Sequence, residues 1–297
     1  MSVFMLAIVL IPRIGVYVNG ARRWINLGFT NFQPSELAKI LLIIFFAKFI
    51  MKHKEDLSEK QTILKAVVLI AIPLALILKE PNLSTTICTA TLFCFLMYVG
   101  GLSYRFIGTV LLITIPVAVI FLSIVVQPNQ KLLDNYQQKR ILAWLEPEKY
   151  ASDEAYQQNN SVMAIGSGQL TGKGLNTSTI ATVKDANFIS EQQTDFIFSV
   201  IGEELGFVGS VIIIAILLLI VLQCIHVARN AKDTKGMLIA AGMGCLIAYQ
   251  TFINVGVATG VIPNTGLPLP FISYGLSSLI SISIGIGVVL NVSMQKT

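Results

Sequence analysis

The sequence predicts an all-α fold, that of a polytopic helical membrane protein. Of the 297 residues 54% are hydrophobic and only 12% are charged, and the mean hydropathy is +0.74, whereas soluble globular domains carry about 25% charged residues. The apolar runs are long and continuous, unlike the alternating segments of about ten residues in a transmembrane barrel. Four cysteines lie inside these runs, at spacings that fit neither a zinc site nor a disulfide framework: Cys88, Cys94, Cys224 and Cys245.

The apolar runs predict about eight membrane spans, because one bilayer crossing takes about 20 apolar residues. They lie near residues 1 to 18, 35 to 51, 62 to 79, 84 to 101, 105 to 126, 196 to 228, 236 to 261 and 272 to 292. The first run opens at Met1 with neither a basic segment nor a small-residue cleavage site. It is therefore not typical of a signal peptide, and we expect the sequence to begin partway along a membrane span.

Basic residues in short connections predict the side of the membrane, because Lys and Arg are retained on the cytoplasmic side. They gather in connections that share one side if every run crosses once: Lys48, Lys52, Lys54, Lys60 and Lys65, then Arg105, then Arg229, Lys232 and Lys235. The C-terminus is then cytoplasmic. Residues 127 to 194 form a long extracellular loop within a single membrane domain of residues 1 to 297. Shorter polar segments at 20–34, 79–82 and 262–272 are expected on the outer side as well.

The first outer segment ends in a helix start. Gln33 precedes Pro34, which suits a first helical turn, Ser35 offers a cap, and Glu36 sits near the positive end of the helix dipole. Glu36 and Lys39 are spaced i,i+3 in an otherwise apolar helix. They either neutralise each other locally or line a polar groove.

A second charged pair follows at the end of another span, where Lys79 and Glu80 precede the helix-stopping Pro81. The simplest interpretation is an ion pair at the membrane interface. The alternative is a site for a phosphate or a sugar, which requires these side chains to converge with other outer polar groups.

A glycine-rich segment at residues 164 to 174 contains a single lysine, Lys173. Amides freed by glycine can cradle a phosphate, and Lys173 could supply the counter-charge, but glycines are also ordinary turn residues. The spacing is not that of a Walker loop.

Asp195 is the leading candidate for chemistry, because it ends the long polar segment and directly precedes Phe196. A low dielectric disfavours charge, so we expect the proton affinity of this carboxylate to rise toward the range of a general base. The alternative is an ordinary N-cap of a membrane helix. Glu203 lies eight positions later, on roughly the same helical face and about 12 Å further along the axis.

The last outer segment contains three prolines and ends in hydroxyl-bearing residues. Irregular backbone near membrane depth is tolerated where it is buried in protein or lines a cavity. Ser273 and Ser277 could therefore present hydroxyls to a site, or could serve only close packing of helices.

Several of these motifs occur together and in order: NGARRWI at 19–25, FQPSELAK at 32–39, AIGSG at 164–168, QTDFIF at 193–198, EELG at 203–206 and the turn at 266–275. In this order they resemble the RodA/FtsW/SpoVE family, also called the shape, elongation, division and sporulation (SEDS) family. The segment with Tyr136, Gln137 and Arg140 is more similar to the elongation member RodA than to the division member FtsW. The resemblance covers essentially the whole chain.

The resemblance implies a peptidoglycan glycosyltransferase of the bacterial cytoplasmic membrane, which polymerises lipid II into glycan strands at the outer face during elongation and shape maintenance. It implies that Asp195 is the family's essential outer aspartate and deprotonates the attacking sugar hydroxyl. From their charge and their side of the membrane, we expect the remaining candidates to bind the substrate, the basic ones against its pyrophosphate and the acids Glu36, Glu80 and Glu203 holding those cations or the sugars in place. The full set is Arg22, Arg23, Gln33, Ser35, Glu36, Lys39, Lys79, Glu80, Lys173, Glu203, Ser273 and Ser277.

The resemblance also implies a class B penicillin-binding protein, a transpeptidase, as partner, besides lipid II and the surrounding membrane lipid. Nucleic acid is not expected, nor is an organic cofactor, and a divalent cation bound by the outer acids is left open. Two other functions stay open from the residues alone: a flippase for lipid-linked precursors, although no internal repeat is found, and a non-catalytic scaffold.

The chain departs from the family pattern in three places. The family pattern has about ten spans, and its first two have no counterpart in this chain. We therefore expect the chain to start within the third helix of that pattern. Asn82 and Ser84 replace an acid and a glycine, and Leu276 replaces a glycine in the final turn.

Overall fold

The computed structural model describes residues 1–12, 14–18, 21–28, 31–127, 135–150, 154–175 and 192–295. The chain forms two compact units. The first unit comprises Met1–Ile113, Leu219–Tyr249 and Gly275–Thr297, and the second comprises Thr114–Leu218 and Gln250–Tyr274.

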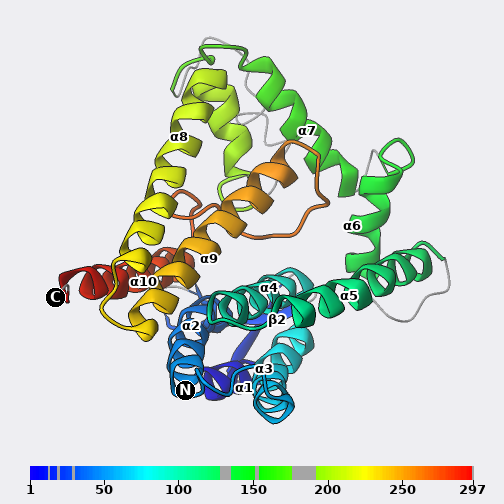
Figure 1. Cartoon of the computed structure of the whole chain (residues 1–297). Helices are drawn as coiled ribbons and strands as arrows, with labels where there is room; N and C mark the ends of the chain where they lie inside the picture. The colour runs from blue at the N-terminus through cyan, green and yellow to red at the C-terminus, as the bar shows by residue number, and fades with distance from the viewer. Residues whose placement is uncertain are drawn as a thin grey trace. The chain divides into compact units, whose positions relative to one another are not determined.

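Helices dominate the first unit (Figure 1). Helices α1 (Ser2–Val9), α2 (Pro34–Lys52), α3 (Lys60–Lys79) and α4 (Leu83–Val99) pack against one another, and α10 (Leu276–Met294) packs on α2. Leu6, Ala38 and Ile77 are fully buried and form a shared core of α1, α2 and α3. Burial of such apolar side chains is the main favourable term that holds neighbouring segments together where water is present, and close packing replaces it where lipid surrounds the helices.

A small antiparallel sheet lies beside α1 and α2. Its strands are β1 (Gly15–Val18), β2 (Ala21–Asn26) and β3 (Asn31–Phe32), with Val16 opposite Trp24 and Ile25 opposite Phe32. The candidate residues Arg22 and Arg23 therefore lie on a strand, which the sequence interpretation did not anticipate.

The predicted first span, residues 1 to 18, is wrong as one continuous helix, because α1 ends at Val9 and β1 follows. Pro12 explains the break: it lacks a backbone N–H and disfavours helical geometry in the residue before it. The β-branched Val16 and Val18 then favour extended backbone.

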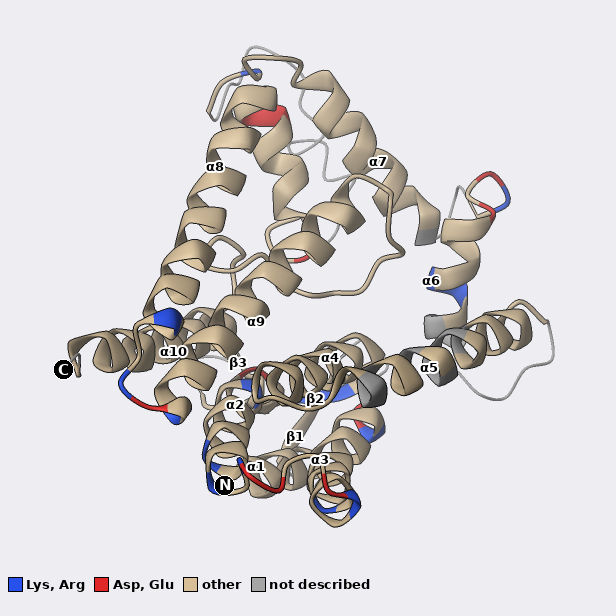
Figure 2. Cartoon of the chain, in the orientation of Figure 1, with Lys and Arg blue, Asp and Glu red and all other residues tan. Residues whose placement is uncertain are grey.

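The other predicted runs correspond to helices. Helix α5 covers Tyr104–Val125, α8 covers Ile197–Arg229 and α9 covers Thr234–Ala258. In the part of the chain that the structure describes, α3, α8, α9 and α10 are long and apolar enough to cross a membrane, and α4 is a shorter apolar helix. Figure 2 shows charged residues mostly at helix ends and in connections. The prediction of a polytopic helical membrane protein is confirmed by this architecture and by the comparisons given below.

The second unit contains two further helices, α6 (Asn135–Leu145) and α7 (Glu154–Ser167), which contact each other. Both bind the C-terminal end of α9 or the residues just after it through side chains. Trp144 Nε1 donates to Gly260 O at 3.2 Å, and Gln158 Nε2 donates to Val257 O at 2.9 Å and to Ile262 O at 2.8 Å. These bonds hold the end of α9 and the loop after it in place.

Candidate functional site

Asp195 lies in the turn before α8, with one residue between it and the first residue of that helix. The next residue, Phe196, is fully buried in a cluster with Val257, against which Ile253 and Ile262 pack. Phe196 thus anchors the turn in the apolar core of the second unit, while Asp195 itself stays half-buried. Asp195 therefore stands at the edge of an apolar core.

Side chains from two elements fix the backbone around Asp195. Asn254, buried in α9, donates from Nδ2 to Asp195 O at 2.9 Å and to Leu267 O at 2.9 Å. The hydroxyl of Ser273 donates to Thr194 O at 2.7 Å and accepts from Leu269 N at 2.7 Å. One amide and one hydroxyl thereby join the turn before α8 to the proline-rich loop 263–275.

The side chains of Asp195 and Arg140 both approach Gly266. A Cβ atom placed on Gly266 would lie 3.3 Å from Asp195 Oδ2 and 3.6 Å from Arg140 Nη1. Arg140 Nη1 also donates to Asn264 O at 3.5 Å, and Gly266 has a φ of +72°, which favours glycine. A carboxylate, a guanidinium and a residue without a side chain thus converge at one point of the second unit.

The sequence interpretation missed two residues of this arrangement. Arg140 was noted only as a point of similarity, and Asn254 was not noted at all. A polar side chain inside an apolar helix is costly unless it has a role, so Asn254 within α9 was a signal that could have been used.

The glycine-rich segment packs against α8 where that helix is broken at Gly206, whose φ is 65° and ψ is −165°. The N–H groups of Lys173 and Gly174 donate to the carbonyls of Glu203 at 2.9 Å and Glu204 at 3.0 Å. A Cβ on Gly172 would approach Glu204 O to 2.2 Å. Close backbone contact therefore accounts for the glycine at position 172. The amides of Lys173 and Gly174 already donate to protein carbonyls.

Lys173 and Glu203 form an ion pair. Lys173 Nζ lies 2.7 Å from Glu203 Oε1, with the two side chains 14% and 1% exposed. The structure thus brings together two of the candidate residues, which lie in different segments of the sequence.

In the first unit, Glu36 and Lys39 pair within α2 at 2.8 Å, with side chains 4% and 1% exposed. Of the two alternatives, mutual neutralisation is the one that the geometry favours. Ser35 is buried, and its hydroxyl has no hydrogen-bond partner among the described residues. Gln33 N donates to Ser277 Oγ at 2.9 Å, so these two candidates also meet.

Arg23 binds the connection between α3 and α4. Its Nε donates to Glu80 O at 2.9 Å, and its Nη2 donates to Pro81 O. The Glu80 carboxyl is buried, and within the described residues neither of its oxygens has a hydrogen-bond partner. Burial raises the pKa of Glu80 from 4.5 to about 8, against the opposing charge of Arg23. The expected interfacial pair is absent among the described residues, because Lys79 is exposed while Glu80 is buried.

Arg22 reaches toward α1, where its Nη1 donates to Leu10 O at 3.5 Å. Its Nε is buried with no hydrogen-bond partner in the part of the chain described.

No group of three or more His, Cys, Asp or Glu side chains among the described residues could hold a metal ion.

The candidates fall into two sets by unit. Asp195, Lys173, Glu203 and Ser273 belong to the second unit, and all others belong to the first: Arg22, Arg23, Gln33, Ser35, Glu36, Lys39, Lys79, Glu80 and Ser277.

Comparison with known proteins shows the family to which the chain belongs. The whole chain, residues 1–297, matches the model of the FtsW/RodA/SpoVE family, described as cell cycle proteins. The chain belongs to the FtsW/RodA/SpoVE family.

Curated members of the FtsW/RodA/SpoVE family resemble the chain over nearly its full length. It is 35% identical to the peptidoglycan glycosyltransferase MrdB of Escherichia coli K12, covering 97% of this chain and 75% of that protein. It is 38% identical to the probable peptidoglycan glycosyltransferase FtsW of Geobacter metallireducens, covering 98% of this chain and 74% of that protein.

Solved structures of the FtsW/RodA/SpoVE family share the fold. A chain from a peptidoglycan synthase complex, in which polymerization and crosslinking are structurally coordinated, is 30% identical with a TM-score of 0.78, over 99% of this chain and 78% of that chain. The rod shape determining protein RodA of Thermus thermophilus is 27% identical with a TM-score of 0.67, over 99% and 76%. A variant of that protein with an aspartate replaced by alanine matches equally well.

Proposed function

We propose that the chain is a peptidoglycan glycosyltransferase that polymerises lipid II, with Asp195 as its catalytic residue. The observation that carries the proposal is the placement of this carboxylate, half-buried at the start of α8 and beside Arg140 at Gly266. The names of the relatives, which cover 97% and 98% of the chain, support the same reaction.

In the proposed reaction Asp195 takes the proton of a sugar hydroxyl on the acceptor. The hydroxyl oxygen forms a bond to the anomeric carbon of the donor, and the bond from that carbon to the lipid pyrophosphate breaks, with its electron pair leaving on the pyrophosphate. A positioned general base contributes about a hundredfold or more to such a step. The two hydrogen bonds of Asn254 hold the backbone of the base and of the adjoining loop.

Basic residues would stabilise the charge on the leaving pyrophosphate. Lys39 and Lys173 are held by Glu36 and Glu203 at 2.8 and 2.7 Å, which fixes each ammonium in one place at the cost of part of its charge. We propose that Arg22, Arg23, Lys79 and the paired lysines serve this role, with Glu80 and the hydroxyls of Ser35, Ser273 and Ser277 and the amide of Gln33 completing the substrate contacts.

We infer the arrangement in the membrane from the distribution of Lys and Arg. The chain is one membrane domain with its C-terminus in the cytoplasm, and segment 127 to 194 is extracellular, so that Asp195 faces the outer side, where lipid II is consumed. A class B penicillin-binding protein is the proposed partner. The similarity to a chain from a synthase complex that coordinates polymerization and crosslinking supports such an assembly.

The test is replacement of Asp195 by Asn, which keeps the shape of the side chain and removes the base. Purified Asp195→Asn protein should lose polymerisation of lipid II by a hundredfold or more, whereas the exposed Asp56→Asn should retain it. Binding to the class B penicillin-binding protein should persist in both.

Three outcomes would contradict the proposal. Undiminished polymerisation by Asp195→Asn would remove the proposed base. Transfer of lipid II across vesicle membranes by protein that polymerises none would favour a flippase, and partner binding as the sole activity of the unmodified protein would favour a scaffold.

A further inference from the structure

A pocket of about 430 Å³ lies in the first unit between the end of α2 and the first half of α3. Its volume is in the range of small-molecule sites. Four apolar side chains and two basic ones line it: Phe49, Leu64, Val68 and Leu69, with His53 and Lys65. The pocket therefore combines apolar walls with basic groups, a composition that suits an amphipathic anion.

The apolar wall contributed by α3 is open to its surroundings. Leu64, Val68 and Leu69 are 64%, 53% and 36% exposed. Helix α3 is long and apolar enough to cross a membrane, and the exposed apolar side chains of a spanning helix lie against lipid hydrocarbon. An acyl chain can therefore enter this pocket directly from the bilayer.

Lys65 brings a positive charge to this wall. It lies in the second turn of α3, five positions after the first residue of that helix, and is exposed. Among the described residues no acid forms an ion pair with it, and these residues include Glu55, Asp56 and Glu59 of the preceding connection. A lysine near the end of a membrane helix extends its ammonium toward the headgroups while its stem covers apolar surface. The ammonium is therefore available to an anion at the level of the headgroups.

His53 holds a fixed imidazole in the same pocket. The residue follows α2 directly, its Nδ1 lies 3.0 Å from Phe49 O, and its ring stacks on that of Phe49 at a centroid distance of 4.5 Å. A carbonyl oxygen only accepts, so Nδ1 carries the proton of this bond. Nε2 then remains for a ligand: it accepts from a hydroxyl when the ring is neutral and donates to a phosphate oxygen when the ring is protonated.

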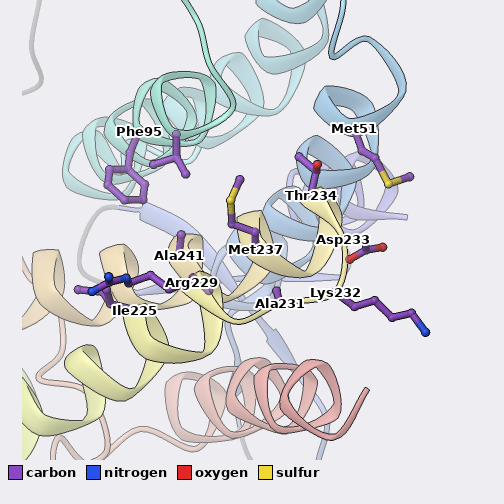
Figure 3. Close-up of a pocket in the computed structure, with 12 residues that line it drawn as sticks. Met51, Phe95, Ile225, Arg229, Ala231, Lys232, Asp233, Thr234, Met237 and Ala241 are labelled. Carbon is purple, nitrogen blue, oxygen red and sulfur yellow. The ribbon is translucent and has the colours of Figure 1, made fainter. Parts of the chain in front are cut away.

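A larger pocket of the first unit, of about 760 Å³ between α2, α4, α8 and α9, differs in the arrangement of its charged groups (Figure 3). Its walls are also mainly apolar. Its two basic side chains, Arg229 and Lys232, extend in opposite directions and do not converge on one anion. The smaller pocket at Lys65 is therefore the better site for an anionic headgroup.

We propose that the pocket between α2 and α3 binds an anionic phospholipid, with an acyl chain against the apolar wall of α3 and the phosphate at Lys65, beside His53. A soluble anion would leave the apolar wall unused, and a lipid without net charge would not neutralise Lys65. A cation near the membrane surface contributes about a fivefold gain in affinity for anionic lipid. The surrounding segment acts in the same sense, because residues 48 to 65 contain five lysines and three acids.

Native mass spectrometry of the delipidated full chain in neutral detergent tests the proposal. Phosphatidylglycerol and phosphatidylcholine with identical acyl chains are the probes. The unmodified protein should bind phosphatidylglycerol more tightly. Lys65→Gln should weaken that binding by about fivefold and leave phosphatidylcholine binding unchanged, whereas Lys65→Arg, which keeps the charge, should retain the preference.

The matched control is Lys54→Gln, which removes the same charge from the same basic segment but outside the pocket. Lys54 Nζ donates to Thr234 Oγ1 at 3.3 Å and so lies at the start of α9. This variant should bind both lipids as the unmodified protein does. The variant Val68→Phe, which adds a ring to the apolar wall, should weaken both lipids together. Measuring the ratio of the two lipids within one sample keeps the result independent of how much protein is folded.

Four results would overturn the proposal. They are equal affinity of the unmodified protein for the two lipids, unchanged phosphatidylglycerol binding in Lys65→Gln, an equal loss in Lys54→Gln, which would mean diffuse attraction by the basic segment, and displacement of the bound lipid by inorganic phosphate at the same concentration. Because none of these readouts involves glycan synthesis, they leave the proposed enzymatic function untouched.

Discussion

Asn254 is a single side chain on which the position of Asp195 depends. Its amide donates to Asp195 O and to Leu267 O, both at 2.9 Å. Replacement by alanine removes both bonds and leaves two carbonyls without these donors, which costs about 2 kcal/mol. We expect Asn254→Ala to lower kcat for lipid II polymerisation by at least about tenfold, with a smaller change in KM.

The matched control is Asn230→Ala, an exposed asparagine just after α8, whose side-chain hydrogen bonds among the described residues go to His226 alone. A purely structural role for Asn254 would lower the melting temperature and the amount of active protein without changing kcat per active site. Active-site titration separates these outcomes, and an unchanged kcat would rule out the positioning role.

Glu80 gives the protein a predictable dependence on pH. Burial raises its pKa from 4.5 to about 8 in the folded chain, so between these values the folded state holds a proton that the unfolded state has released. Stability therefore falls as the pH rises through this window, by up to about 1.4 kcal/mol per pH unit, and the loss ends above about pH 8.

Glu80→Gln mimics the protonated acid and should remove this dependence. Its melting temperature should match the unmodified protein near pH 5 and exceed it by several degrees at pH 8, measured in the same detergent. The exposed Glu148→Gln should follow the unmodified protein throughout. Parallel curves for Glu80→Gln and the unmodified protein would contradict the assigned pKa.

At the scale of elements, the helices could be predicted because long apolar runs leave few alternatives. The runs predicted near 35–51 and 196–228 correspond to α2 at Pro34–Lys52 and α8 at Ile197–Arg229. The first run could not be assigned in the same way, because an apolar stretch fits a buried helix and a buried strand equally well. Only Pro12 and the β-branched residues after it distinguish the two.

The break in α8 has a geometry that constrains the sequence. Gly206 has a φ of 65°, and a Cβ there would lie 2.3 Å from Gly172 N. Gly206→Ala combines strain with a backbone clash, so we expect a loss of about 2 kcal/mol and a fall in melting temperature of about 5 °C.

Gly166→Ala in α7 is the control for that substitution, because nothing lies within 4 Å of the added Cβ. Alanine in a helix should leave stability unchanged or raise it by up to about 1 kcal/mol. A Gly206→Ala protein as stable as the control would show that α8 can straighten and that the close contact with the glycine-rich segment is dispensable.

At the scale of the whole molecule, the candidate site was only partly predictable. The pairing of Glu36 with Lys39 follows from their i,i+3 spacing. The pairing of Lys173 with Glu203 does not, because 30 positions separate them and only the fold brings them together. The same holds for Arg140 beside Asp195. Sequence patterns identify polar groups in apolar surroundings, whereas their partners depend on tertiary packing.

Sidedness is the whole-molecule property on which the proposed reaction depends, and single cysteines can test it. In a chain whose four cysteines are replaced by alanine, Glu148→Cys and Lys60→Cys each place one thiol at an exposed position, the first after α6 and the second at the first residue of α3. A membrane-impermeant maleimide applied to intact cells should label position 148 and not position 60, because the basic connection is retained inside.

Permeabilised cells provide the control, since both thiols should then react to the same extent. Labelling of position 60 in intact cells with protection of position 148 would invert the proposed arrangement. Asp195 would then face the cytoplasm, and a polymerase acting at the outer surface could not use it. Labelling at both positions in intact cells would mean that the number of crossings between them is even rather than odd.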